Sequence, residues 1–109
     1  MNQVRLGATD LQVSELGIGA WSWGDKLFWD FGKSHDENDI YAAMDATLAA
    51  GINFFDTAEI YGSGESEKIL GKYLHAKRAT IITATKFMPF PWRLRQTSPL
   101  AAMHRSLRR

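Results

Sequence analysis

The sequence predicts an α/β fold in which three strand–helix units build a parallel sheet, preceded by a β-hairpin. Short apolar runs alternate three times with helical periodicity or helix-start signals, separated by turns rich in glycine, serine or proline. Connections long enough to hold a helix between consecutive strands favour parallel crossovers. The 109 residues, 45% apolar and 23% charged, have the composition of a globular chain.

A hairpin and a short strand are predicted at the amino end. Polarity alternates over residues 4–6 and 11–13, on both sides of a turn at 7–10 that contains glycine and aspartate, which is typical of two paired strands. Residues 16–19, Leu-Gly-Ile-Gly, then indicate a brief buried strand. The loop that follows, 21–35, contains five aromatic side chains: Trp21, Trp23, Phe28, Trp29 and Phe31.

Two helices are predicted from cap residues and periodicity. Asp36 suits the N-cap of a helix that starts near Glu37, and Gly51 occupies the position of a C-terminal cap. A second strand, 52–55, leads through a turn rich in glycine and serine to a second helix. Apolar pairs one turn apart mark this helix: Ile69 with Tyr73, and Leu70 with Leu74.

A third unit is predicted from residue 79 onward. Residues 79–84 are rich in β-branched side chains, and Ser98 and Pro99 suit the N-cap and first turn of a third helix. A closed eight-stranded barrel needs about 250 residues. We therefore expect three of eight units, the N-terminal part of a (β/α)8 TIM barrel that is incomplete as given. A small three-stranded α/β domain is the alternative.

Composition and charge exclude several classes of function. Thirteen Lys and Arg against 12 Asp and Glu give a net charge of +1, so nothing indicates binding to nucleic acid or to a membrane surface. The absence of cysteine excludes disulfides and a cysteine nucleophile, and the three histidines lack metal-ligand spacing. No apolar stretch approaches the roughly 20 residues that span a bilayer. We expect a cytoplasmic protein without a metal.

Three polar side chains follow two neighbouring strands, at the end where parallel α/β folds carry their functional residues. Asp56 follows the second strand, Tyr61 lies in the next loop, and Lys86 follows the third strand. An ammonium near a phenol favours the phenolate, and a carboxylate paired with the lysine keeps the lysine charged. A general acid of this kind contributes about 10²- to 10⁴-fold to a rate. The alternative is a buried Asp–Lys ion pair with Tyr61 as loop packing.

The residues around these positions closely resemble the signature of the aldo-keto reductases. The resemblance is carried by one block: Phe55-Asp56-Thr57-Ala58, Tyr61-Gly62, Gly64, Ser66-Glu67 and Leu70-Gly71. Two further segments, 16–21 and 83–87, are similar to segments that flank the signature in that family, in the same order. The resemblance runs from about Val4 to Arg109, so we treat residues 1–109 as one domain.

The resemblance implies an oxidoreductase that uses NADPH to reduce aldehydes and ketones, small-molecule substrates, with the hairpin closing the bottom of the barrel. By position, Tyr61 would be the general acid, Lys86 the residue that tunes it, and Asp56 the partner of Lys86. The family's fourth catalytic residue, a histidine at the end of the next strand, would lie beyond Arg109. The late barrel loops that hold the cofactor's phosphate would lie there too.

The resemblance also implies cofactor contacts at the strand ends, from Gly19, Ala20, Trp21 and Asp56. The loop aromatics suit a flat apolar substrate or a nicotinamide ring, or equally the filling of the core. The residues that would decide between NADPH and NADH, and the oligomeric state, are not indicated by this sequence. The alternative from another class is a truncated, catalytically silent chain that acts as an interaction module through an open sheet edge.

Two further motifs have structural interpretations. Tyr73 and Lys77 show the Y-x-x-x-K spacing of the short-chain dehydrogenases, but no glycine-rich first turn precedes them. We interpret them as a solvated helix end, where basic residues are favourable. Residues 62–64, Gly-Ser-Gly, precede a helix and could hold an anion on free N–H groups, but we interpret them as a structural turn.

Overall fold

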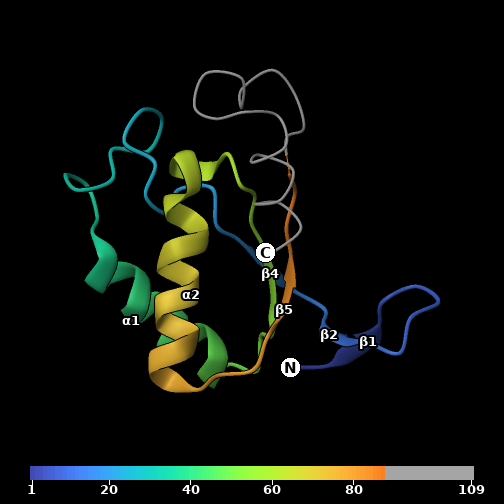
Figure 1. Ribbon diagram of the computed structural model, residues 1–109. Coiled ribbons are helices and arrows are strands. Elements are labelled where there is room, and N and C mark those ends of the chain that lie inside the picture. The colour runs from blue at the N-terminus through green and yellow to red at the C-terminus, as the bar shows by residue number, and fades with distance from the viewer. Residues whose placement is uncertain (88–109) are drawn as a thin grey trace.

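The computed structural model describes residues 1–87 of the chain (Figure 1). The predicted third helix, with Ser98 and Pro99 at its start, lies outside the described residues. The elements, in chain order, are β1 (Gln3–Arg5), β2 (Gln12–Ser14), β3 (Gly17–Gly19), α1 (Glu37–Ala49), β4 (Phe54–Asp56), the 3-10 helix η1 (Tyr61–Gly64), α2 (Glu65–Lys77) and β5 (Ile82–Ala84).

The predicted hairpin is confirmed. Strands β1 and β2 are antiparallel, with Val4 opposite Val13. Asn53, just before β4, anchors the hairpin. Its side-chain carbonyl accepts a hydrogen bond from the Ser14 N–H at 2.8 Å, and its own N–H donates to the Ser14 hydroxyl at 3.1 Å. The hairpin therefore lies at the amino end of β4, away from the edge where the parallel strands end (Figure 1).

The predicted parallel sheet is also confirmed, with strand order β3-β4-β5. Each strand has three residues, so β4 and β5 are shorter than the segments predicted from the sequence. Phe55 is in register with Ile18 and Thr83, whereas Asp56 is in register with Gly19 and Ala84. Because successive side chains alternate between the faces of a sheet, these two rows belong to opposite faces.

Helix α1 begins and ends at the predicted caps. The Asp36 carboxylate accepts hydrogen bonds from the N–H groups of Asn38 and Asp39 at 2.8 and 3.0 Å. The Asp39 side chain accepts one from the Asp36 N–H at 2.9 Å, which completes a capping box. Gly51, with φ of 81°, follows the last turn in the left-handed conformation that favours glycine. No helix within residues 1–87 is long and apolar enough to cross a bilayer.

The core lies between one face of the sheet and the two helices, which cover that same face (Figure 1). Met44 of α1 and Phe55 of β4 are fully buried, and Ile69 of α2 is 2% exposed. Trp23 of the first loop packs on Phe55, with ring centroids 6.2 Å apart, and is 7% exposed. Burial of each large apolar side chain contributes about 1.5–3 kcal/mol, so this layer holds the helices on the sheet.

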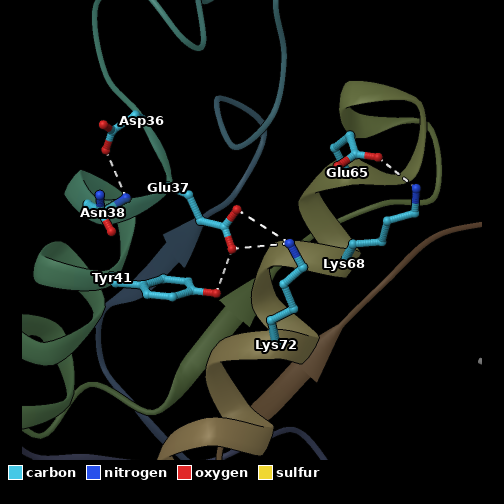
Figure 2. A network of polar contacts seen from close by, with 7 residues as sticks. All are labelled: Asp36, Glu37, Asn38, Tyr41, Glu65, Lys68 and Lys72. Carbon is cyan, nitrogen blue, oxygen red and sulfur yellow. Dashed lines mark hydrogen bonds and ion pairs between the residues drawn. The ribbon is translucent and has the colours of Figure 1, made fainter.

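Polar side chains join α1 to α2 outside the core (Figure 2). The Tyr41 hydroxyl donates to Glu37 at 2.7 Å, and Lys72 of α2 reaches the same carboxylate at 3.3 Å. The carboxylate raises the pKa of Tyr41 to about 12, mainly through this hydrogen bond. The same bond lowers the pKa of Glu37, and Lys72 acts in the same direction.

A second contact between the helices corrects one prediction. The Tyr73 hydroxyl donates to Asp45 of α1 at 2.6 Å, and Lys77 forms an ion pair with the same carboxylate at 3.1 Å. Lys77 is half-exposed, as predicted for a helix end, but Tyr73 is 1% exposed. The interpretation of both as a solvated helix end was therefore wrong for Tyr73, because a helix end that packs on a neighbouring helix buries one of its faces.

Candidate active site

The carboxyl edge of the parallel sheet brings Asp56 and Lys86 together. Asp56 ends β4, and Lys86 lies two residues beyond Ala84, its partner in register on β5. Backbone hydrogen bonds between the strands continue past β5, since the Glu59 N–H donates to the Lys86 carbonyl at 2.9 Å. Lys86 is thereby placed beside Asp56, and its Nζ donates to Asp56 Oδ1 at 2.6 Å.

A backbone group completes the binding of the Lys86 ammonium. Nζ also donates to the Thr57 carbonyl at 3.0 Å, an acceptor that the sequence analysis missed because side-chain chemistry says nothing of it. Two small residues, Gly19 and Ala84, flank Asp56 in register. A Cβ on Gly19 would have no atom of residues 1–87 within 4 Å, so the space beside Asp56 is open.

Tyr61 lies against the same ammonium. Lys86 Nζ is 5.3 Å from the centre of the Tyr61 ring, within the range of a cation–π interaction. Tyr61 begins the 3-10 helix, and the chain turns sharply after it because Gly62 has φ of 56°. A Cβ on Gly62 would lie 2.7 Å from the carbonyl oxygen of Gly24 in the first loop. The main chain of the first loop therefore lies close to the turn that begins at Tyr61.

The electrostatics of the site favour a charged lysine. The pKa of Lys86 is raised, first by its hydrogen bond to the Asp56 carboxylate and further by the charge of that carboxylate and by Tyr61, while partial burial opposes the shift. The Lys86 and Asp56 side chains are 55% and 46% exposed. The ion pair of the alternative interpretation is therefore present, but it is not buried. A pair this exposed contributes at most about 1 kcal/mol to stability.

The aromatic loop divides between the core and the site. Trp21 stacks on Tyr61, with centroids 6.1 Å apart and ring planes 25° apart, and contacts the exposed rings of Phe28 and Trp29. Trp23 fills the core, and Phe31 packs against it. Core filling is therefore confirmed for Trp23 and Phe31, whereas a substrate or nicotinamide contact of the exposed rings stays a prediction. The sequence does not indicate which of these rings face the core, because the loop has no periodicity that would distinguish them.

The predicted cofactor contacts differ in their surroundings. Gly19 and Asp56 lie beside open space at the sheet edge, and Trp21 is 46% exposed. Ala20 is fully buried, with its N–H donating to the Asp56 carbonyl at 2.8 Å and its carbonyl accepting from the Ser66 hydroxyl at 2.8 Å. Sequence reasoning had assigned no role to Ser66. Its position on the same helical face as Ile69 and Tyr73 was the available signal, a polar residue on an apolar stripe.

A carboxylate, an ammonium and a phenol meet at the carboxyl edge of the parallel sheet of this α/β protein, beside exposed aromatic rings. Comparison with known proteins gives the family. Residues 15–109 match the sequence profile of the Aldo/keto reductase family, and the chain belongs to this family. The resemblance seen in the block from Phe55 to Gly71 is thereby confirmed.

Individual relatives are similar over most of this chain. It is 38% identical, over 117 aligned positions, to the chloroplastic pyridoxal reductase of Arabidopsis thaliana, covering 98% of this chain and 31% of that protein. Among solved structures, a holo aldo-keto reductase from Bacillus halodurans is 41% identical with a TM-score of 0.63, covering 78% of this chain and 25% of that one.

The glycerol dehydrogenase of Gluconobacter oxydans is 31% identical with a TM-score of 0.60, covering 76% of this chain and 24% of that one. The chain thus spans about a quarter to a third of the length of these relatives. Its α/β architecture agrees with the barrel of the solved aldo-keto reductases. The closed eight-unit barrel stays a prediction.

Proposed function

We propose that this chain supplies the proton-donating part of an oxidoreductase that reduces aldehydes and ketones to alcohols with NADPH. Membership of the aldo/keto reductase family supports an oxidoreductase. One observation carries the finer assignment. The Lys86 ammonium is held 2.6 Å from the Asp56 carboxylate and lies 5.3 Å from the centre of the Tyr61 ring.

The three side chains have distinct tasks in this proposal. Tyr61 donates its phenolic proton to the carbonyl oxygen of the substrate as negative charge develops there. The Lys86 ammonium stabilises the phenolate that is left. Asp56 keeps the lysine protonated, since its carboxylate raises the pKa of Lys86. Bound NADPH would supply the hydride for the carbonyl carbon.

The strand ends fit a flat nicotinamide ring. Gly19 leaves its side of the edge open, and Trp21 presents a half-exposed ring stacked on Tyr61. In this proposal Gly19, Trp21 and Asp56 contact the cofactor. Ala20 supports them from the core, because both of its backbone polar groups are already hydrogen-bonded within the protein.

A catalytically silent interaction module is not favoured, because the chain belongs to an enzyme family and carries the polar trio at the open edge of its sheet. The chain covers 31% of the length of the pyridoxal reductase, so the substrate and the activity of the whole protein are proposals. The choice of NADPH over NADH rests on the family resemblance. A cytoplasmic location stays a prediction of the sequence.

Replacement of Tyr61 tests the proposal in the intact protein that carries this chain. Tyr61→Phe should lower carbonyl-dependent NADPH oxidation by at least about 10²-fold, because the general acid is lost, while cofactor binding measured by fluorescence is retained. Tyr41→Phe is the matched control, since it removes a phenolic hydroxyl from α1, outside the site. Unchanged turnover in Tyr61→Phe would remove Tyr61 from its role.

A further inference from the structure

Ser66, in the first turn of α2, has a fully buried hydroxyl between two strand ends. This hydroxyl donates to the Ala20 carbonyl at 2.8 Å and lies 2.9 Å from the Thr57 hydroxyl. A hydroxyl has a single hydrogen. Because that of Ser66 is used on Ala20, Thr57 must be the donor to Ser66. The bonds therefore run in one direction, from Thr57 to Ser66 to Ala20.

Each end of this chain of hydrogen bonds adjoins the candidate active site. Ala20 precedes Trp21, whose ring stacks on Tyr61. Thr57 follows Asp56, and its carbonyl is the second acceptor of Lys86 Nζ, at 3.0 Å. Thr57 is 1% exposed, so water does not compete for its hydroxyl. Hydrogen bonds among such buried groups are costly to break.

The next residue of α2 reaches the third strand end. Glu67 accepts a hydrogen bond from the Thr85 hydroxyl at 2.7 Å, and Thr85 adjoins Lys86. Ser66 and Glu67 together thus bind the residues that follow β3, β4 and β5. Both residues belong to the signature block of the sequence, which by itself assigned them no task.

We propose that Ser66 and Glu67 are positioning residues that fix the Lys86 ammonium against Asp56 and the Trp21 ring against Tyr61. Ser66 acts through Ala20 and Thr57, and Glu67 acts through Thr85. The catalytic consequence rests on the proposed function, whereas the positioning itself can be measured without turnover. Neither residue touches the substrate in this assignment.

Two pairs of variants separate positioning from folding. Thr57→Val and Thr85→Val each remove a hydroxyl while nearly preserving the side-chain shape, and Thr57→Ser and Thr85→Ser restore the hydroxyl. Ser66→Ala removes the central hydroxyl of the hydrogen bonds that run from Thr57 through Ser66 to Ala20. If Ser66→Ala fails to fold, the threonine variants decide the question, because each leaves the Ser66 bond to Ala20 in place.

The first measurement follows the Lys86 side chain by 13C NMR during a pH titration of the intact protein that carries this chain. We expect a lower titration midpoint for Lys86 in both valine variants, because the ammonium is held less firmly at Asp56, and a wild-type midpoint in both serine variants. Nuclear Overhauser contacts between the Trp21 and Tyr61 rings should weaken in Thr57→Val. Wild-type values in folded valine variants would overturn the proposal.

The second measurement uses steady-state kinetics of the intact protein. A loss of alignment of about 1 Å can cost up to about 10²-fold in rate. We expect kcat to fall about 10-fold or more in the valine variants, with KM for the carbonyl compound unchanged and with recovery in the serine variants. Equal kcat in all four variants would overturn the proposal. If Tyr61→Phe itself kept full turnover, the proposed function would fail, while the NMR titration would still test the positioning.

Discussion

The buried phenol of Tyr73 should make the stability of the fold depend on pH above 9. Its hydroxyl donates to Asp45 at 2.6 Å, and burial, followed by this bond, raises the pKa of Tyr73 to about 12. In an unfolded chain the pKa of tyrosine is about 10. The folded state therefore holds the proton more tightly. The contribution of Tyr73 to the unfolding free energy is complete below about pH 9 and is lost as the pH rises toward 12.

The size of the effect follows from these two pKa values. Linkage gives a loss of about 1.3 kcal/mol of unfolding free energy between pH 9 and pH 11 from Tyr73 alone. At pH 7, Tyr73→Phe should be less stable than the wild type by about 1 kcal/mol, because a hydrogen bond is lost. Ionisation of Tyr73 at high pH stabilises the unfolded state of the wild type only. The difference in unfolding free energy between the two proteins should therefore fall to about zero near pH 11.

Urea denaturation followed by tryptophan fluorescence at pH 7, 9 and 11 measures this difference. Tyr41, with its pKa also raised to about 12 by the hydrogen bond to Glu37, is present in both proteins, so its contribution cancels. Tyr41→Phe is the matched control and should show the same closing difference. A difference between wild type and Tyr73→Phe that is as large at pH 11 as at pH 7 would refute the reasoning.

Three further predictions concern the site, its turn and helix α2. Asp56→Asn should lower the pKa of Lys86, because the carboxylate that raises it is gone, and a 13C titration that shows no change would contradict the ion pair. Gly62→Ala should lower the unfolding free energy by about 1–3 kcal/mol, since φ is 56° and a Cβ would lie 2.7 Å from the Gly24 carbonyl oxygen. Gly71→Ala, inside α2 with no atom of residues 1–87 within 4 Å of its Cβ, should instead raise it by about 0.5–1 kcal/mol. Thermal unfolding compares the two glycine variants.

The predictable part of this molecule is the part governed by local chemistry. Asp36 could be recognised as a cap because its carboxylate satisfies N–H groups two and three residues away. Asp56 and Lys86 could be placed at one edge because parallel strands end on the same side of a sheet. That reasoning needs only strand order and direction, which the alternation of strands and helices supplies.

The remainder depends on contacts between segments far apart in the chain. The bond from Tyr73 to Asp45 requires the relative rotation of two helices, which the pattern of each helix alone does not give. Likewise, the hydrogen bond from Lys86 to the Thr57 carbonyl depends on the path of the backbone after β4, which the sequence pattern does not specify. The sequence also left the exposure of the pair formed by Asp56 and Lys86 open, because strand ends border solvent as readily as core.

The main chains of Gly62 and Gly24 approach so closely that a Cβ on Gly62 would lie 2.7 Å from the Gly24 carbonyl oxygen. No side chain fits between the two loops at this point. A substitution at residue 62 would therefore have to displace either the first loop or the turn that begins at Tyr61, so the glycine is a requirement of the packing between these loops.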